Sequence, residues 1–165
     1  MKLSEGVEAA IHCATLLAQL AEGKSLPANM LAEYHGLSSS YLLKHLKQLT
    51  AAGVLESVSG PHGGYRLARR PDAITLLDVV LAIEGPKPAF RCAEIRQRGP
   101  GALEPETYLK PCGINAAMLK AERAYRAVLR ETTLSDVIRG YQADADPRAI
   151  AFGCAFVERN QRPQG

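Results

Sequence analysis

Near the start of the chain, a carboxylate and an imidazole are placed one helical turn apart. Glu8 and His12 lie within the run GVEAAIHC, which we predict to be part of a helix. Residues four positions apart lie one above the other on a helix surface, so the two side chains can reach the same object. On the residues alone we favour water as that object, because the same stripe carries Thr15 and Gln19 and has the polarity of a solvent-exposed face.

The cysteines offer thiolate chemistry at four scattered positions, Cys13, Cys92, Cys112 and Cys154. Their spacing is not the dense framework of a small secreted scaffold, so we expect free thiols or ligands in a reducing compartment. Cys13 lies toward the apolar side of its predicted helix, where a free cysteine behaves as a small hydrophobe. Cys154 lies near the C-terminal end of the sequence, and we rank both as weak candidates for ligands.

Cys92 and Cys112 belong to a segment, 85–112, that lacks hydrophobic periodicity and holds five of the ten prolines. Only short helical turns are expected in such a segment. Loops of this length are uncommon in compact domains unless they are functional or disordered. A pair of unreactive loop thiols is the plain alternative, but we favour a role for the two cysteines in fastening the loop.

Composition narrows the class of protein. The chain has 165 residues, which is enough for one domain with a core or for a small domain with an appended helical element. It has no Trp and few aromatic residues, which favours a mainly helical protein with a core of Leu, Val, Ile and Ala. A net charge of +3 is compatible with nucleic-acid binding. Glu5 and Glu8 interrupt the first apolar run, and no run reaches the roughly 18 uncharged residues of a membrane span. We therefore expect a soluble cytoplasmic protein with no membrane partner.

The region 28–69 has the pattern of a helix-turn-helix followed by a hairpin. A short helix over 28–35 is ended by Gly36, and one of Ser38, Ser39 or Ser40 begins a third helix that runs to about Ala52. Two β-prone runs, 54–58 and 65–67, then flank a Gly/Pro-rich turn. A hairpin directly after the second helix of a helix-turn-helix is a wing.

Four further segments complete the prediction. The first helix begins near Ser4 and runs to about residue 21, and Thr75 with Asp78 begins a helix that ends at Gly85. A long amphipathic helix spans 114–130, and Thr133 begins a short one. No element is assigned to residues 144–165, whose last positions we expect to be mobile.

The second helix of the helix-turn-helix has the residue types that contact DNA. Short polar groups at its N-terminus suit phosphates and base edges, and the helix N-terminus itself favours an anion. We expect the following residues of this helix and the wing to contact DNA: Ser38, Ser39, Ser40, Tyr41, Lys44, Lys47, His62, Gly63 and Arg66. The plain alternative is an ordinary helical surface, but the hairpin at the right distance favours DNA.

The run from LAEYHGLSSSYLLKHLKQL through GPHGGYRLAR to ITLLDVVLAIEG resembles the DNA-binding domain of the Rrf-type transcriptional regulators, and the resemblance covers residues 1 to about 140. It implies a mainly α fold with a small β-hairpin wing, and a homodimer that is held by the long helix and reads a pseudo-palindromic operator. On this basis 1–84 is the winged helix-turn-helix DNA-binding domain, 85–112 a cysteine-bearing sensor loop, 113–140 the dimerisation helix region and 141–165 a C-terminal tail.

The segments FRCAEIRQRGPG and PCGINAAM are similar to those of redox-sensing members of this family. Iron–sulfur members typically carry three closely placed cysteines here, whereas this loop has two. The resemblance implies a [2Fe-2S] cluster bound by Glu8, His12, Cys92 and Cys112. Imidazole replaces thiolate on one iron of Rieske-type clusters, and a carboxylate is a harder and rarer ligand.

We therefore expect a redox sensor in which the oxidised cluster protein binds its operator, and in which reduction or cluster loss weakens binding. A thiol–disulfide pair of Cys92 and Cys112, or a zinc site, remains the alternative for the same regulator. Enzymatic activity is not expected, because the sequence has no Gly-rich nucleotide loop after a strand and no nucleophile with both a base and an orienting group.

Overall fold

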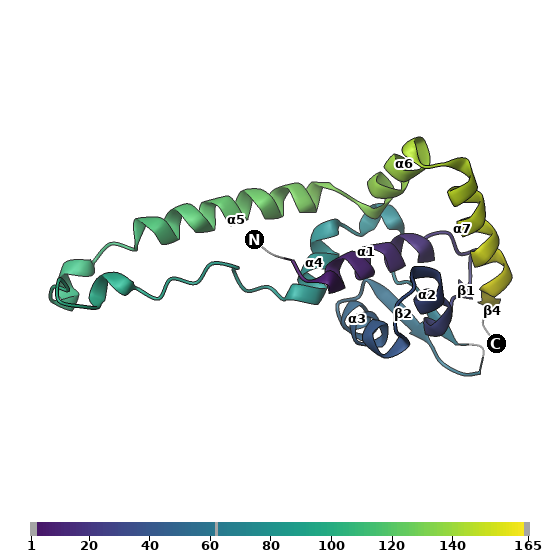
Figure 1. The fold of residues 1–165 in the computed structure, drawn as a ribbon, viewed down its shortest axis with the longest axis horizontal. Coiled ribbons are helices and arrows are strands. Elements are labelled where there is room, and N and C mark those ends of the chain that lie inside the picture. Colours follow the sequence, from purple (N-terminus) through teal and green to yellow (C-terminus); the bar gives the residue numbers. More distant parts are fainter. Residues whose placement is uncertain (1–2, 62, 164–165) are drawn as a thin grey trace.

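The computed structural model describes residues 3–61 and 63–163. Three helices, α1 (Glu5–Leu17), α3 (Ser39–Ala51) and α4 (Leu76–Glu84), pack against one another and enclose most of the core (Figure 1). Helix α2 (Ala28–His35) packs on α3, as a helix-turn-helix requires. The predicted fold, mainly helical with a small hairpin, is confirmed.

The core is aliphatic, as the composition predicts. Leu42, Leu46 and Leu49 from one face of α3 are completely buried, together with Cys13 and Ala14 of α1. Burial of this apolar face, rather than helix propensity, holds so short a helix in place. The opposite face of α3 stays exposed, which leaves it available to a partner.

Several helix N-termini are capped by the side chain of the residue just before the helix. Thr75 and Asp78 form a capping box at α4, and Thr133 and Asp136 form a second one at α6 (Leu134–Asp144). Ser4 stands at the N-cap position of α1, but its side chain does not cap that helix. Its hydroxyl and its backbone N–H both donate to Glu84 of α4, so this serine joins two helices instead.

The wing is the antiparallel hairpin of β2 (Leu55–Val58) and β3 (Gly64–Leu67), in which Leu55 pairs with Leu67 and Val58 with Gly64. Packing within the chain explains why two positions of the wing are glycine. A Cβ on Gly64 would lie 2.5 Å from the carbonyl oxygen of Leu26, and one on Gly63 would lie 2.2 Å from that of Val58. These glycines allow the hairpin to close and to pack on the body, independently of any DNA.

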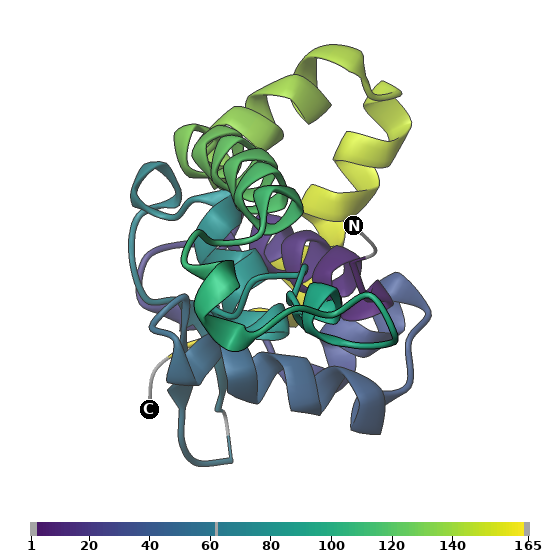
Figure 2. The same cartoon turned by 90° about the vertical axis from the view of Figure 1, so that its left-hand side faces the viewer.

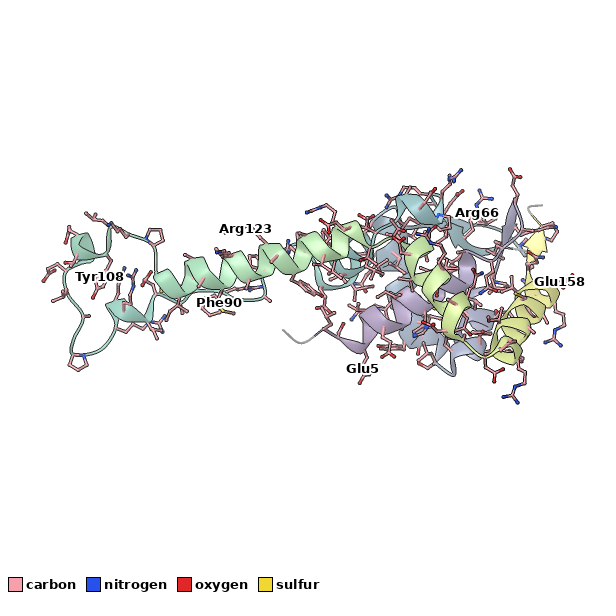
Figure 3. The ribbon with its side chains drawn as sticks, turned by 90° about the horizontal axis from the view of Figure 1, so that it is seen from above. Glu5, Arg66, Phe90, Tyr108, Arg123 and Glu158 are labelled. Carbon is pink, nitrogen blue, oxygen red and sulfur yellow. The ribbon has the colours of Figure 1, made fainter. Side chains whose placement is uncertain are left out.

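The segment after α4 leaves the body and returns along α5 (Gly113–Glu131), as Figures 1 and 2 show. We call residues 85–131 the arm and the rest of the described chain the winged body. The loop of the arm contains only two short 3-10 turns, Ile95–Gln97 and Pro105–Tyr108, as the prolines predict. Figure 3 places Phe90 beside α5 and Tyr108 at the far end of the arm.

Hydrogen bonds join the arm to the body and join the first part of its loop to α5. The backbone N–H of Leu76 donates to the carbonyl of Thr132, which ties the end of α5 to the start of α4. Along the arm, Glu122 accepts from the backbone N–H of Ala89, and Arg126 donates to the carbonyl of Pro86. Side chains of α5 therefore fasten the first part of the loop, in addition to whatever the cysteines do.

The C-terminal region holds an element that the sequence analysis did not assign. Helix α7 (Pro147–Asn160) follows α6, and β4 (Arg162–Pro163) pairs with β1 (Lys24–Ser25). The signal was present, because Asp146 is the N-cap and Pro147 the first helical residue, a typical helix start. The 3-10 turn Pro71–Ala73 completes the elements. None of the helices in the described residues is both long and apolar enough to cross a membrane.

Candidate functional site

The exposed face of α3 carries the residues predicted to contact DNA. The side chain of Ser38 accepts from the backbone N–H of Tyr41 and caps the helix. The remaining predicted contacts on this helix are all exposed: Ser39, Ser40, Tyr41, Lys44 and Lys47. His45 is buried beneath them, where the Tyr41 ring packs edge-on against it at 4.7 Å. Tyr41 of the exposed face is therefore packed against a buried side chain of the same helix.

On the wing, Arg66 forms a bidentate pair with Glu56 of the neighbouring strand, at 3.1 and 2.9 Å. The guanidinium lowers the pKa of Glu56, so this carboxylate stays charged. Arg66 thus has an intramolecular partner that a DNA phosphate would have to share. Gly63 lies in the turn of the hairpin, and His62 lies outside the described residues.

Two cysteines that are distant in sequence meet at the far end of the arm. The Sγ atoms of Cys92 and Cys112 and a carboxylate oxygen of Glu94 all lie within 4.8 Å of one another. Two thiolates and a carboxylate at this separation form a donor set that suits a metal centre. The sequence analysis overlooked Glu94, although a carboxylate two residues after a cysteine is a recognisable signal.

The contacts of Arg96 hold together the loop segments that carry Cys92, Glu94 and Cys112. Arg96 donates to Glu94 and to the carbonyl of Lys110, which connects the Cys92 side of the loop to the Cys112 side. Its guanidinium lies 5.3 Å from the centre of the Tyr108 ring, and the Tyr108 hydroxyl donates to the carbonyl of Arg96. Glu94 has a left-handed backbone, with φ of 47°. The loop end is therefore ordered by its own polar contacts.

The start of α5 favours the thiolate form of Cys112. The backbone N–H groups of the first turn, that of Asn115 foremost, lower the pKa of this thiol. The neighbouring Cys92 and the positive charge of Arg96 lower it further. A thiolate is the form that binds metal and attacks disulfides. Both cysteines are free thiols in this structure.

Glu8 and His12 lie on the body and not at the arm end. Both are exposed on α1, one turn apart, as the spacing predicts. In the described part of the chain, neither joins a metal-capable group of three or more residues. The ring of His12 lies 5.7 Å from that of His35, and burial followed by the charge of His12 lowers the pKa of His35. A single chain thus keeps the two halves of the predicted ligand set apart.

The other two cysteines differ sharply from this pair. Cys13 is fully buried in the core, and burial raises the pKa of its thiol to about 12, so it packs as a small apolar residue. Cys154 is exposed on α7, away from the arm. Neither cysteine joins the group of Cys92, Glu94 and Cys112 in the described structure.

A helix-turn-helix with an exposed, basic second helix and an adjoining hairpin defines a winged-helix DNA-binding protein. Comparison with known proteins identifies the family of this winged-helix protein. The model of the Rrf2 family, described as iron-dependent transcriptional regulators, matches residues 3–140. The chain belongs to the Rrf2 family of transcriptional regulators, whose members are in general not enzymes.

Individual relatives agree with this assignment. The HTH-type transcriptional regulator YffB of Lactococcus lactis is 33% identical over 137 residues, which span 83% of this chain and 86% of that protein. The solved structure of CymR, the global cysteine regulator of B. subtilis, has 28% identity and a TM-score of 0.63, over 84% of this chain and 97% of that one. The solved structure of T. potens IscR has 25% identity and a TM-score of 0.65, over 92% of this chain and 96% of that one.

Proposed function

We propose that this transcriptional regulator is a cytoplasmic homodimer that binds a pseudo-palindromic operator and senses redox state through a [2Fe-2S] cluster shared between its subunits. It would then act in the manner of the redox-sensing regulator RsrR, to which its loop segments are similar. The observation that carries the proposal is the meeting of Cys92 and Cys112 at the end of the arm, with their sulfur atoms within 4.8 Å.

The donor set fits such a cluster if two subunits contribute. Iron–sulfur clusters usually take four protein ligands, and this loop supplies two thiols. Glu94 is close to both, but its carboxylate is paired with Arg96. Glu8 and His12 stand exposed on α1 with the spacing that two ligands on one helix require. We therefore assign Cys92 and Cys112 of one subunit and Glu8 and His12 of the other as ligands.

The dimer is supported by the surface of α5. The apolar stripe of this amphipathic helix contains Ile114, Met118 and Val128, which are 67%, 43% and 62% exposed in the single chain. Large apolar side chains aligned on one helix face and left open are typical of an interface. Pairing of two α5 helices would place each arm end near the other subunit's body.

Communication with DNA would follow the packing of the chain. When bound, the cluster supplies a centre that gains or loses one electron. His12 must be neutral to ligate, so its protonation or release would change how α1 holds the arm. Helix α1 packs on α3 and α4, and α4 packs on α5. Half-sites of an operator lie about 34 Å apart, so a small rigid-body shift of the two α3 helices lowers affinity.

An anaerobic absorption spectrum tests the cluster directly. Wild-type protein should be coloured, and Cys92→Ala should abolish the visible bands, whereas His12→Ala should shift or weaken them because one ligand is replaced. A matched pair separates the two carboxylates: Glu8→Gln should change the spectrum, and Glu94→Gln should leave it nearly unchanged. A colourless wild-type protein with stoichiometric iron absent would end the cluster proposal.

A DNA-binding assay tests the redox control. A duplex selected by the oxidised protein from a random-sequence pool serves as the operator, and dithionite should weaken binding to it. His12→Ala should bind equally before and after dithionite. Unchanged wild-type affinity after reduction would remove redox control and leave the DNA-binding assignment intact.

The alternative is a regulator of the same family without a cluster. The adjacency of two free thiols, one of them with a lowered pKa, also suits a reversible disulfide between Cys92 and Cys112 or a zinc site with Glu94. Elemental analysis and the visible spectrum distinguish the three, because zinc and a dithiol are both colourless.

A further inference from the structure

A cavity lies on the body, and no residue of the arm in the same chain lines it. It has a volume of about 400 Å³ and is enclosed by α1, the end of α2, α6 and α7. This size falls within the range of small-molecule sites in proteins, roughly 300 to 1,000 Å³. One wall is made by α7, which lies beyond residues 3–140 that match the family model.

The lining is apolar with hydrogen-bonding groups and without charged side chains. Ile11, Val137 and Ile150 supply aliphatic surface, and no Asp, Glu, Lys or Arg is among the residues that line the cavity. Tyr34 and Tyr141 add rings with hydroxyl groups. A charged ligand would lose hydration here without gaining a partner of opposite sign.

Polar side chains of the lining can hydrogen-bond to a ligand. Gln19 and Gln142 contribute amide groups, beside the hydroxyls of Tyr34 and Tyr141. A hydroxyl or carbonyl group on an apolar ring can bond to one of these groups, whereas a plain hydrocarbon ring leaves them unpaired. The site therefore combines ring-sized apolar space with hydrogen-bonding side chains.

We propose that this cavity binds a small uncharged ligand that consists of an apolar ring with a hydroxyl or carbonyl substituent. The ring packs between the aliphatic side chains and the tyrosines, and the substituent bonds to a hydroxyl or amide group of the lining. His12 also lines the cavity, but the binding argued here requires no cluster and does not rest on the proposed redox function.

The C-terminal end of α7 connects this cavity to the wing. Beyond the helix, Arg162 and Pro163 form β4, which pairs with β1. Arg162 donates to the carbonyl of Pro61 in the wing turn, at 3.2 Å. The side chain of Gln161 accepts from the backbone N–H of Ala21. A ligand that displaces α7 would therefore pull on the hairpin, so occupancy of the cavity should change DNA affinity.

Ligand-detected NMR with p-cresol tests the site, and toluene, which has the same ring without the hydroxyl, is the matched probe. We expect p-cresol to bind more tightly than toluene. Ala149→Met should weaken p-cresol binding at least tenfold, because Ala149 lines the cavity. Ala151→Met, on the same helix but not among the lining residues, should bind as wild type does.

Three results would each overturn the proposed site. Absence of p-cresol binding, equal binding of toluene, or equal binding by Ala149→Met would overturn the site. Binding by Cys92→Ala protein, which is not expected to assemble a cluster, should match wild type and separates this proposal from the redox one. Saturating p-cresol should change affinity for the selected duplex at least threefold in wild type and not in Ala149→Met; no change would overturn the link through β4.

Discussion

In the winged body, α3 buries Leu42, Leu46 and Leu49 completely, whereas α5, a longer helix of 19 residues, buries none of its residues. The body is stabilised by its own aliphatic core. The arm is held by hydrogen bonds and ion pairs, such as those of Glu122, Arg126 and Arg96, and leaves its apolar side chains open. The contrast is what we expect if the body is complete in one chain and the proposed partner subunit covers the arm.

The largest effect should come from the core of the body. Leu46→Ala is expected to lower the free energy of unfolding by about 2 to 5 kcal/mol, because the side chain is fully buried and leaves a cavity. Leu109→Ala in the arm, where the side chain is 86% exposed, should change it by less than about 0.5 kcal/mol. Urea denaturation of both variants measures the difference, and equal losses would contradict the contrast.

Dimerisation should depend on the open face of α5. Met118→Asp is expected to weaken self-association about 30-fold or more, because it places a charge in the apolar stripe. Ala116→Asp, on the opposite face of the helix and exposed, introduces the same charge and should have a much smaller effect. Sedimentation at several protein concentrations gives the dissociation constants, and an unaffected dimer in Met118→Asp would place the interface elsewhere.

An added Cβ should affect stability differently at a glycine of the body and at a glycine of the arm. Gly64→Ala should cost about 1 to 3 kcal/mol, because the added Cβ would lie 2.5 Å from a backbone oxygen of Leu26. Gly101→Ala in the arm meets no atom within 4 Å and should be close to neutral. Thermal unfolding of the two variants tests this. Similar melting temperatures would show that the wing does not pack as closely as described.

The smallest effect concerns the exposed face of α3. Lys44→Ala should weaken DNA binding and lower the slope of log affinity against log salt concentration by about 1, because one phosphate contact is lost. Arg148→Ala on α7, where the arginine is paired with Asp146, should leave the slope unchanged. Fluorescence anisotropy across a salt series measures both, and identical slopes for Lys44→Ala and wild type would remove this residue from the interface.

Most elements could be predicted from sequence because their signals are local. The two capping boxes, the Gly36 stop and the hairpin turn each depend on residues within a few positions of one another. Helix α7 has an equally local start at Asp146 and Pro147, but its scattered apolar residues gave no clear helical stripe. They acquire an apolar environment only by packing, as Phe156 does against Tyr34 with ring centres 5.0 Å apart.

Part of the candidate metal site could likewise be predicted from sequence, and part of it could not. The spacing of Glu8 and His12 determines that they share one face of a helix, and this required no tertiary information. Glu94 has a local signal, two residues after Cys92, but its proximity to Cys112, 18 positions further along the chain, could not be predicted. Their proximity depends on how Arg96 and Tyr108 fold the loop back on itself.

The sequence by itself determined the helix-turn-helix, the wing, the helix caps and the amphipathic stripe of α5, because hydrophobic periodicity and capping act over one or two turns. Tertiary structure alone decided that Cys92 meets Cys112, that Arg66 is paired across the wing, and that α7 closes a cavity over α1. These features depend on contacts between residues 10 to more than 100 positions apart, whose geometry is set by packing and not by local preference.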